Sequence, residues 1–85
     1  MLNKRRNEFH ILSDIMTLSQ EGVNKTQILY KCNLSYHLLK KYLDFLVNNR
    51  FIDKKQNGSK RKVYILTKKG YSFLSDINNI LVWFN

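Results

Sequence analysis

The sequence is poor in several residue types, and each shortage excludes a class of protein. Its 85 residues include no proline, three glycines and one cysteine. A single cysteine excludes an internal disulfide, and Cys32 is predicted to be a small buried thiol. The absence of repeats and of low-complexity linkers predicts one small domain that spans residues 1–85.

Motifs of catalysis and of metal binding are also missing. The chain contains no glycine-rich phosphate loop, no nucleophile elbow and no plausible catalytic dyad. His10 and His37 have no cysteine or carboxylate partners at the spacing of metal ligands. We therefore expect no enzymatic activity, no metal and no other cofactor, and no small-molecule ligand is evident.

Long apolar segments are absent as well. The longest charge-free apolar stretch, residues 77–84, is too short to span a bilayer. Lys4, Arg5 and Arg6 are similar to the start of a signal peptide, but polar residues interrupt the apolar region that should follow. Together with the lack of disulfides, these absences predict a cytoplasmic protein without a membrane partner.

Acidic residues are scarce and unevenly distributed. There are 15 Lys and Arg against six Asp and Glu, which gives a formal charge of +9. No acid lies between Glu21 and Asp44, or between Asp53 and Asp76. Basic stretches without acids are typical of nucleic-acid binding, although a basic protein can instead bind anionic membranes or simply be basic. We expect DNA to be the partner and the location to be nucleoid-associated.

The middle of the chain predicts two short helices joined by a tight turn. The first would span residues 25–32 and begin with a capping box formed by Asn24 and Gln27. After the turn, Ser35 would cap a second helix that spans residues 35–49. A lysine-rich hairpin follows. Helix, turn, helix and charged hairpin is the order of a winged helix-turn-helix, an α+β fold.

Two further helices complete the predicted fold. One precedes the pair and spans residues 7–19, and Val23 would then form a short strand against the hairpin. The other begins at Thr67, whose side chain can cap it. The winged helix would thus occupy residues 7–66, with a three-helix core and an antiparallel hairpin, and the C-terminal helix residues 67–85.

The second helix of the central pair has one apolar and one polar side at 100° per residue. The apolar side gathers Leu38, Leu39, Tyr42, Leu43, Phe45 and Leu46. The polar side gathers Tyr36, His37, Lys40, Lys41 and Asp44. Recognition helices present such groups to base edges and phosphates in the major groove, whereas an ordinary amphipathic helix exposes them only to solvent.

The hairpin signal is the dipeptide Asn57-Gly58, which is typical of a two-residue type I′ turn. Such a turn would pair Gln56 with Ser59, Lys55 with Lys60, Lys54 with Arg61 and Asp53 with Lys62. Two of these pairs are like-charged, which destabilises an isolated hairpin and which a bound polyanion would relieve. The alternative is an edge whose lysines prevent strand-to-strand aggregation.

Three segments carry a resemblance to a family. Residues 25–30 (KTQILY), 33–36 (NLSY) and 66–70 (LTKKG) together resemble the small archaeal winged-helix DNA-binding proteins. That group contains predicted transcriptional regulators and chromatin-type proteins, and the resemblance covers about residues 8–81. It implies binding of double-stranded DNA and, for several members, dimerisation through the last helix.

One position departs from the family's pattern. Arg50 stands where winged helices often carry a glycine that ends the recognition helix. The sequence therefore predicts that Asn49 takes the left-handed cap instead.

We predict a transcriptional regulator that prefers some DNA sequences over others, with its recognition helix in the major groove and residues 54–62 along the phosphates. Alternatives are a nucleoid-associated protein with little sequence preference and a winged-helix protein-interaction module. The residues expected to contact DNA are Lys25, Ser35, Tyr36, His37, Lys40, Lys41, Lys54, Asn57, Lys60, Arg61 and Lys62.

The last helix carries an apolar stripe that predicts a homodimer. At 100° per residue, the stripe gathers Phe73, Leu74, Ile77, Ile80, Leu81 and Phe84, and Trp83 lies just beside it. The residues expected at the dimer interface are Leu74, Ile77, Ile80, Leu81, Trp83 and Phe84. The alternative is that this end of the helix packs on the first helix as ordinary core.

Overall fold

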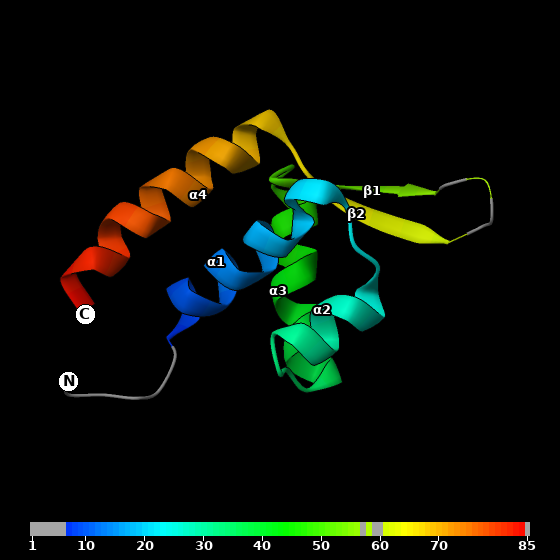
Figure 1. Cartoon of the computed structure of the whole chain (residues 1–85), viewed down its shortest axis with the longest axis horizontal. Coiled ribbons are helices and arrows are strands. Elements are labelled where there is room, and N and C mark those ends of the chain that lie inside the picture. Colours follow the sequence, from blue (N-terminus) through cyan, green and yellow to red (C-terminus); the bar gives the residue numbers. More distant parts are fainter. Residues whose placement is uncertain (1–6, 57, 59–60, 85) are drawn as a thin grey trace.

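The computed structural model describes residues 7–56, 58 and 61–84. Over these residues the predicted α+β winged helix-turn-helix is confirmed, with a two-stranded antiparallel sheet and a C-terminal helix (Figure 1). The elements are α1 (Glu8–Leu18), the 3-10 helix η1 (Ser19–Glu21), α2 (Lys25–Lys31), α3 (Tyr36–Asn48), β1 (Ile52–Gln56), β2 (Lys62–Leu66), α4 (Lys68–Leu81) and the 3-10 helix η2 (Val82–Phe84).

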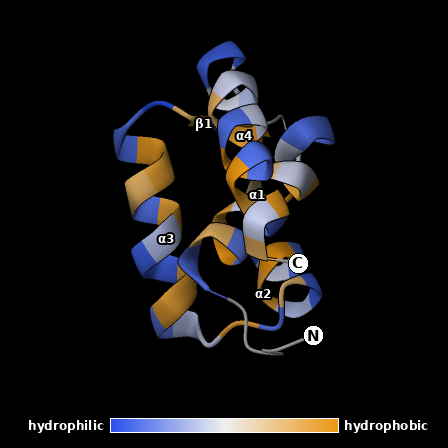
Figure 2. Cartoon of the chain, turned by 90° about the vertical axis from the view of Figure 1, so that its left-hand side faces the viewer, coloured by the Kyte–Doolittle hydropathy of each residue, from blue (hydrophilic) through white to orange (hydrophobic). Residues whose placement is uncertain are grey.

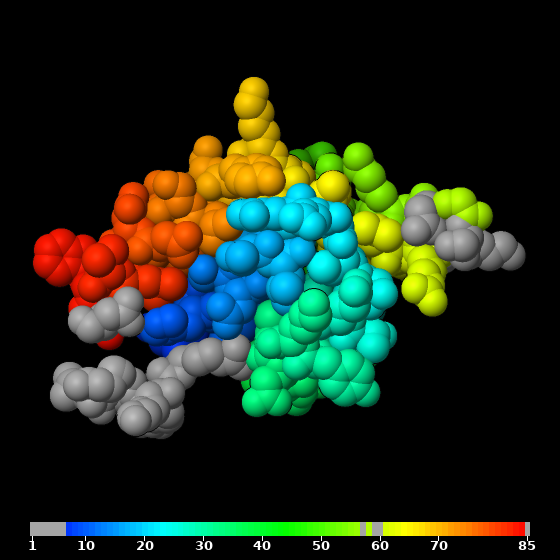
Figure 3. Space-filling model, in the orientation of Figure 1, coloured from blue at the N-terminus to red at the C-terminus, as the bar shows by residue number. Residues whose placement is uncertain are grey.

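The hairpin and the end of α4 lie at opposite ends of the molecule (Figure 1). In the space-filling view the hairpin extends beyond the helical body as a separate projection (Figure 3). α4 packs along α1, where the Ser13 hydroxyl donates a hydrogen bond of 2.9 Å to Oδ1 of Asn78. The two ends are therefore separate surfaces, which different partners can contact.

Local capping residues begin each of the first three helices, and the predicted caps at Asn24 and Ser35 are confirmed. The Asn7 and Asn24 side chains accept hydrogen bonds from the backbone of His10 (2.9 Å) and Gln27 (2.8 Å), which complete capping boxes before α1 and α2. Ser35 Oγ accepts a hydrogen bond of 3.2 Å from the Leu38 N–H and so caps α3.

The register of the hairpin corrects the predicted two-residue turn. The observed pairs are Ile52 with Leu66, Asp53 with Ile65, Lys54 with Tyr64, Lys55 with Val63 and Gln56 with Lys62. The predicted pairs of Lys54 with Arg61 and of Asp53 with Lys62 are therefore wrong, and Lys55 does not face Lys60. Burial decides the register, because it places fully buried Ile52 opposite buried Leu66, and a shift by an odd number of residues would turn one of them to solvent. Asn57, Ser59 and Lys60 lie outside the described residues.

The end of α3 corrects the predicted cap. Asn49 keeps a negative φ of −92°, whereas Arg50 has φ 62° and takes the left-handed conformation itself. The backbone N–H of Arg50 donates to the carbonyl of Val47, and that of Phe51 donates to the carbonyl of Leu46. This pair of bonds is a Schellman motif, which requires the left-handed residue at the position of Arg50.

The predicted dimer seam on α4 also needs correction. Leu74, Ile77 and Leu81 are 5%, 1% and 9% exposed and belong to the protomer's own core. They are buried because α4 packs on α1, and Figure 2 shows hydrophobic and hydrophilic residues alternating along both helices. Ile80, Trp83 and Phe84 remain exposed.

The start of α4 lies against the connection between α3 and β1. Thr67 donates its N–H to the carbonyl of Phe51 (3.0 Å) and caps Gly70 with its side chain (2.9 Å). A Cβ on Gly70 would overlap the Phe51 carbonyl oxygen and a methyl group of Leu66. Glycine is thus required here because two backbone segments touch.

We predict that Gly70→Ala destabilises the fold by about 1–3 kcal/mol through this overlap, although alanine favours helices. Urea unfolding followed by circular dichroism measures the change. Ser75→Ala, at an exposed position of the same helix, is the control and should be neutral or slightly stabilising. Equal stability of the two variants would contradict the close approach.

Candidate nucleic-acid interface

α3 presents its polar side to solvent. Tyr36, His37, Lys40, Lys41 and Asp44 are all exposed, as the periodicity predicts. Leu39, Tyr42, Leu43 and Leu46 are buried. Phe45 was expected in the core but is 43% exposed, at the margin where its ring lies 6.2 Å and 6.4 Å from those of Phe51 and Phe73.

A groove between α3 and β1, here called the α3 groove, brings several predicted residues together. Lys25, Tyr36, Lys40 and Lys54 line it, from three different elements. The Lys25 ammonium lies 5.8 Å from the centroid of the Tyr36 ring, within the range of a cation–π interaction. The remaining lining residues are Leu43, Asp44, Val47, Asn48 and Tyr64.

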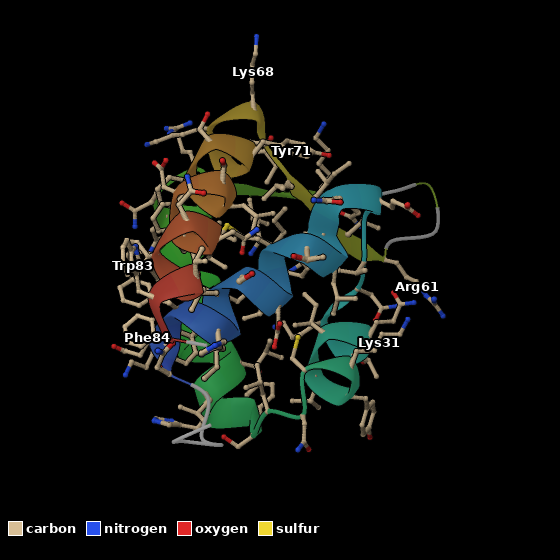
Figure 4. The ribbon with its side chains drawn as sticks, turned by 60° about the vertical axis from the view of Figure 1, so that its left-hand side comes forward. Lys31, Arg61, Lys68, Tyr71, Trp83 and Phe84 are labelled. Carbon is tan, nitrogen blue, oxygen red and sulfur yellow. The ribbon has the colours of Figure 1, made fainter. Side chains whose placement is uncertain are left out.

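A second groove, here called the α2 groove, lies between the start of α2 and the hairpin. It combines Lys25 with Arg61 and Lys62 of the hairpin. Figure 4 shows Arg61 and Lys31 on the same side of the molecule, where the hairpin approaches α2. Lys25 and Tyr64 line both grooves, so the two form one continuous basic surface.

Strand alternation explains which hairpin lysines reach this surface. Residues directly opposite one another in a hairpin point to the same face, and neighbours along a strand point to opposite faces. Lys54 and its partner Tyr64 therefore share the face of the grooves, together with Lys62. Lys55 is opposite Val63 and lies on the other face.

Tyr64 lies where the two grooves meet, and it is not among the site residues that the sequence predicts. Its backbone exchanges two hydrogen bonds with Val23, of 3.0 Å and 2.7 Å, which confirms the predicted short strand against the hairpin. The side chain is buried, and burial raises the pKa of its phenol above the ordinary 10.0. Its position two residues after Lys62 on the expected strand was the sequence signal that could have found it.

Lys40 and Asp44 form an ion pair on the exposed side of α3. Lys40 Nζ lies 3.0 Å from Asp44 Oδ2, and both side chains remain more than half exposed. The hydrogen bond to Asp44, followed by its charge, raises the pKa of Lys40, which is fully protonated at neutral pH. The spacing of four residues on a helix could have predicted this pair.

Other predicted residues lie outside the two grooves. Lys41 borders a separate apolar cleft against α1, with Glu8 and Phe9, and its ammonium lies 5.4 Å from the Tyr42 ring centroid. His37 is exposed near the start of α3, and Ser35 serves as the helix cap. The positions of Asn57 and Lys60 are outside the described residues.

Charge is segregated between the two ends of the molecule. Residues 25–69 contain 12 of the 15 Lys and Arg residues. Residues 7–24 and 70–84, which form α1, η1 and most of α4, contain no Lys or Arg and hold four of the six acids. The cations of the described residues are therefore concentrated in α2, α3, the connection to the hairpin, the hairpin itself and the first two residues of α4.

Comparison with known proteins identifies the family of this chain. A family model described as a winged helix-turn-helix matches residues 5–82, and the chain belongs to this family. The uncharacterized protein MJ0287 of Methanocaldococcus jannaschii is 37% identical over 78 residues, which cover 91% of this chain and 78% of that protein.

Solved structures are similar over most of the chain. Sso10a-2, a DNA-binding protein from Sulfolobus solfataricus, aligns with a TM-score of 0.81 and 28% identity, covering 89% of this chain and 79% of that one. F93 from STIV, a winged-helix DNA-binding protein, shares the fold with a TM-score of 0.73 at 15% identity, covering 93% and 91%. The predicted resemblance to small archaeal winged-helix proteins is confirmed. Among the residues that the structure describes, no helix has both the length and the apolar character needed to cross a bilayer.

Proposed function

We propose that this protein binds double-stranded DNA as a transcriptional regulator that prefers some sequences over others. In this proposal α3 enters the major groove, while Lys54, Arg61 and Lys62 contact the phosphates beside it. The observation that carries it is the convergence of cations from α2, β1 and the second half of the hairpin on two adjoining grooves, one of which is lined by α3. Sso10a-2, which is similar over most of its length, is itself a DNA-binding protein.

A second candidate is a nucleoid-associated protein with little sequence preference. The cations of the basic surface favour it, because they attract phosphates whatever the base sequence. Selection of bound duplexes from a random pool separates the two roles. A recovered consensus supports a regulator, and its absence supports a chromatin protein in the nucleoid.

The basic surface makes a quantitative prediction about salt. If Lys25, Lys54, Arg61 and Lys62 each neutralise a phosphate, log affinity should fall against log salt with a slope of about −3 to −4 per protomer. Titration of a fluorescent duplex at several salt concentrations measures this slope. A slope flatter than about −2 would reject the proposed surface.

Neighbouring lysines on opposite faces of the hairpin provide a matched test. Lys54→Ala should weaken binding to all duplexes and reduce the salt slope by about 1, because it removes a phosphate contact. Lys55→Ala removes the same charge from the other face and should change both quantities less. Fluorescence anisotropy with one specific and one unrelated duplex reports both. Equal effects of the two variants would mean that net charge alone drives binding.

We also propose that the protein is a homodimer that associates through the end of α4. Ile80, Val82, Trp83 and Phe84 are exposed there, with Trp83 at 87%, and Figure 4 shows Trp83 and Phe84 at the same end of the ribbon. Soluble proteins rarely leave such a group uncovered. Two copies can approach through this face without bringing lysines or arginines of the described residues together, and both basic surfaces then stay free for one duplex.

Sedimentation equilibrium at micromolar concentration tests the dimer. Wild type should run at about twice the chain mass of 10.2 kDa. Trp83→Asp with Phe84→Asp should give a folded monomer, because both side chains are exposed in the protomer. Tyr30→Asp is the control, since Tyr30 is 76% exposed on α2 and should leave the dimer intact. A monomeric wild type would refute the proposal.

A further inference from the structure

One acid lies among the cations that line the α3 groove. Asp44 shares that groove with Lys25, Lys40 and Lys54. A carboxylate there weakens the attraction of the surface for phosphates, whatever the DNA sequence. An exposed ion pair on a helix contributes little to folding stability, so stability does not explain this carboxylate.

The ion pair presents a donor and an acceptor side by side. Lys40 Nζ and Asp44 Oδ2 are 3.0 Å apart on the solvent side of α3, with 65% and 58% of the two side chains exposed. An ammonium has three N–H donors and uses one for Asp44, and the carboxylate has a second oxygen. Both groups can therefore contact a further partner without breaking the pair.

The major-groove edge of a G·C base pair is the complement of this arrangement. Guanine presents the acceptors N7 and O6, and cytosine beside it presents the N4 amino donor. O6 and N4 are joined by the Watson–Crick hydrogen bond, so their separation is that of Nζ and Oδ2 here, about 3 Å. An A·T pair also places an acceptor, thymine O4, beside a donor, adenine N6. Its thymine methyl group, however, stands where guanine offers Lys40 the second acceptor N7, and its adenine N7 is an acceptor beside the Asp44 carboxylate.

We propose that Lys40 and Asp44 act as one unit that reads a G·C base pair, Lys40 donating to guanine and Asp44 accepting from the cytosine amino group. This inference rests on the proposed placement of α3 in the major groove. Asp44 is then a specificity-determining residue. It holds the Lys40 ammonium toward the base edge, and it disfavours duplexes that offer only phosphates.

The first experiment identifies the base pair. Duplexes selected from a random pool by the wild-type protein should share one G·C position. Replacing that pair by A·T should weaken binding by about 5-fold to 150-fold, the range expected for one base-edge contact. Replacing its guanine by inosine removes only a minor-groove amino group and should leave binding unchanged.

The second experiment tests whether Asp44 causes the preference for a G·C base pair. Asp44→Asn should bind random duplexes more tightly and should lose the preference for G·C over A·T, because an asparagine amide also pairs with adenine. Asp53→Asn changes the net charge equally, on a hairpin residue paired with Ile65 away from the grooves, and should keep the preference. Asp44→Glu retains an acid at the same helical spacing and should restore part of it.

The outcomes separate this inference from the proposed function. If wild type binds no duplex, the proposed function fails. If it binds with the expected salt slope but selects no G·C position, or if Asp44→Asn and Asp53→Asn lose the same discrimination, the reading unit is overturned while DNA binding stands.

Discussion

The fold depends on the contact between the first turn of α4 and the segment that joins α3 to β1. Gly70 allows the two backbones to touch at Phe51, and Thr67 bonds to the same carbonyl while it caps the helix. Lys69 adds a hydrogen bond of 3.0 Å to the carbonyl of Asn49 at the end of α3. The end of α3, the base of the hairpin and the start of α4 are therefore held at one point, and the geometry of the basic surface follows from it.

The charged residues are unevenly distributed among the elements that meet there. α2, α3 and the hairpin carry the cations around the grooves, whereas α1 and the part of α4 after its first two residues pack together through apolar side chains and carry no Lys or Arg. Such a separation lets a small domain use one face for a polyanion and the other for an apolar contact without either weakening the other. In the proposed assembly the two functions occupy opposite ends of a molecule of only 85 residues.

The sequence predicts where helices begin, because the caps that start them are local. The structure confirms the caps at Asn24, Ser35 and Thr67 and the periodicity of α3. Each of these features depends only on residues within or next to the helix concerned. The hairpin register was missed because it depends on the burial of Ile52 and Leu66 against helices distant in the sequence. A stripe on α4 shows which face is apolar, but not whether α1 or another chain covers it. Likewise, Lys41 falls on the polar side of α3 by periodicity, and only tertiary packing places it beside α1 instead of in the α3 groove.

In the proposed DNA complex, the position of Tyr64 affects how strongly double helices of different shape would bind. Its backbone is bonded to Val23 on one side and paired with Lys54 on the other, and it lines both grooves. The hairpin is thereby fixed to the helical body at a point between the groups proposed to contact phosphates and those proposed to contact bases. If both sets of groups bind one duplex, their fixed spacing requires the duplex to fit it. The width and stiffness of the double helix then enter the binding energy even at base pairs that no side chain reaches.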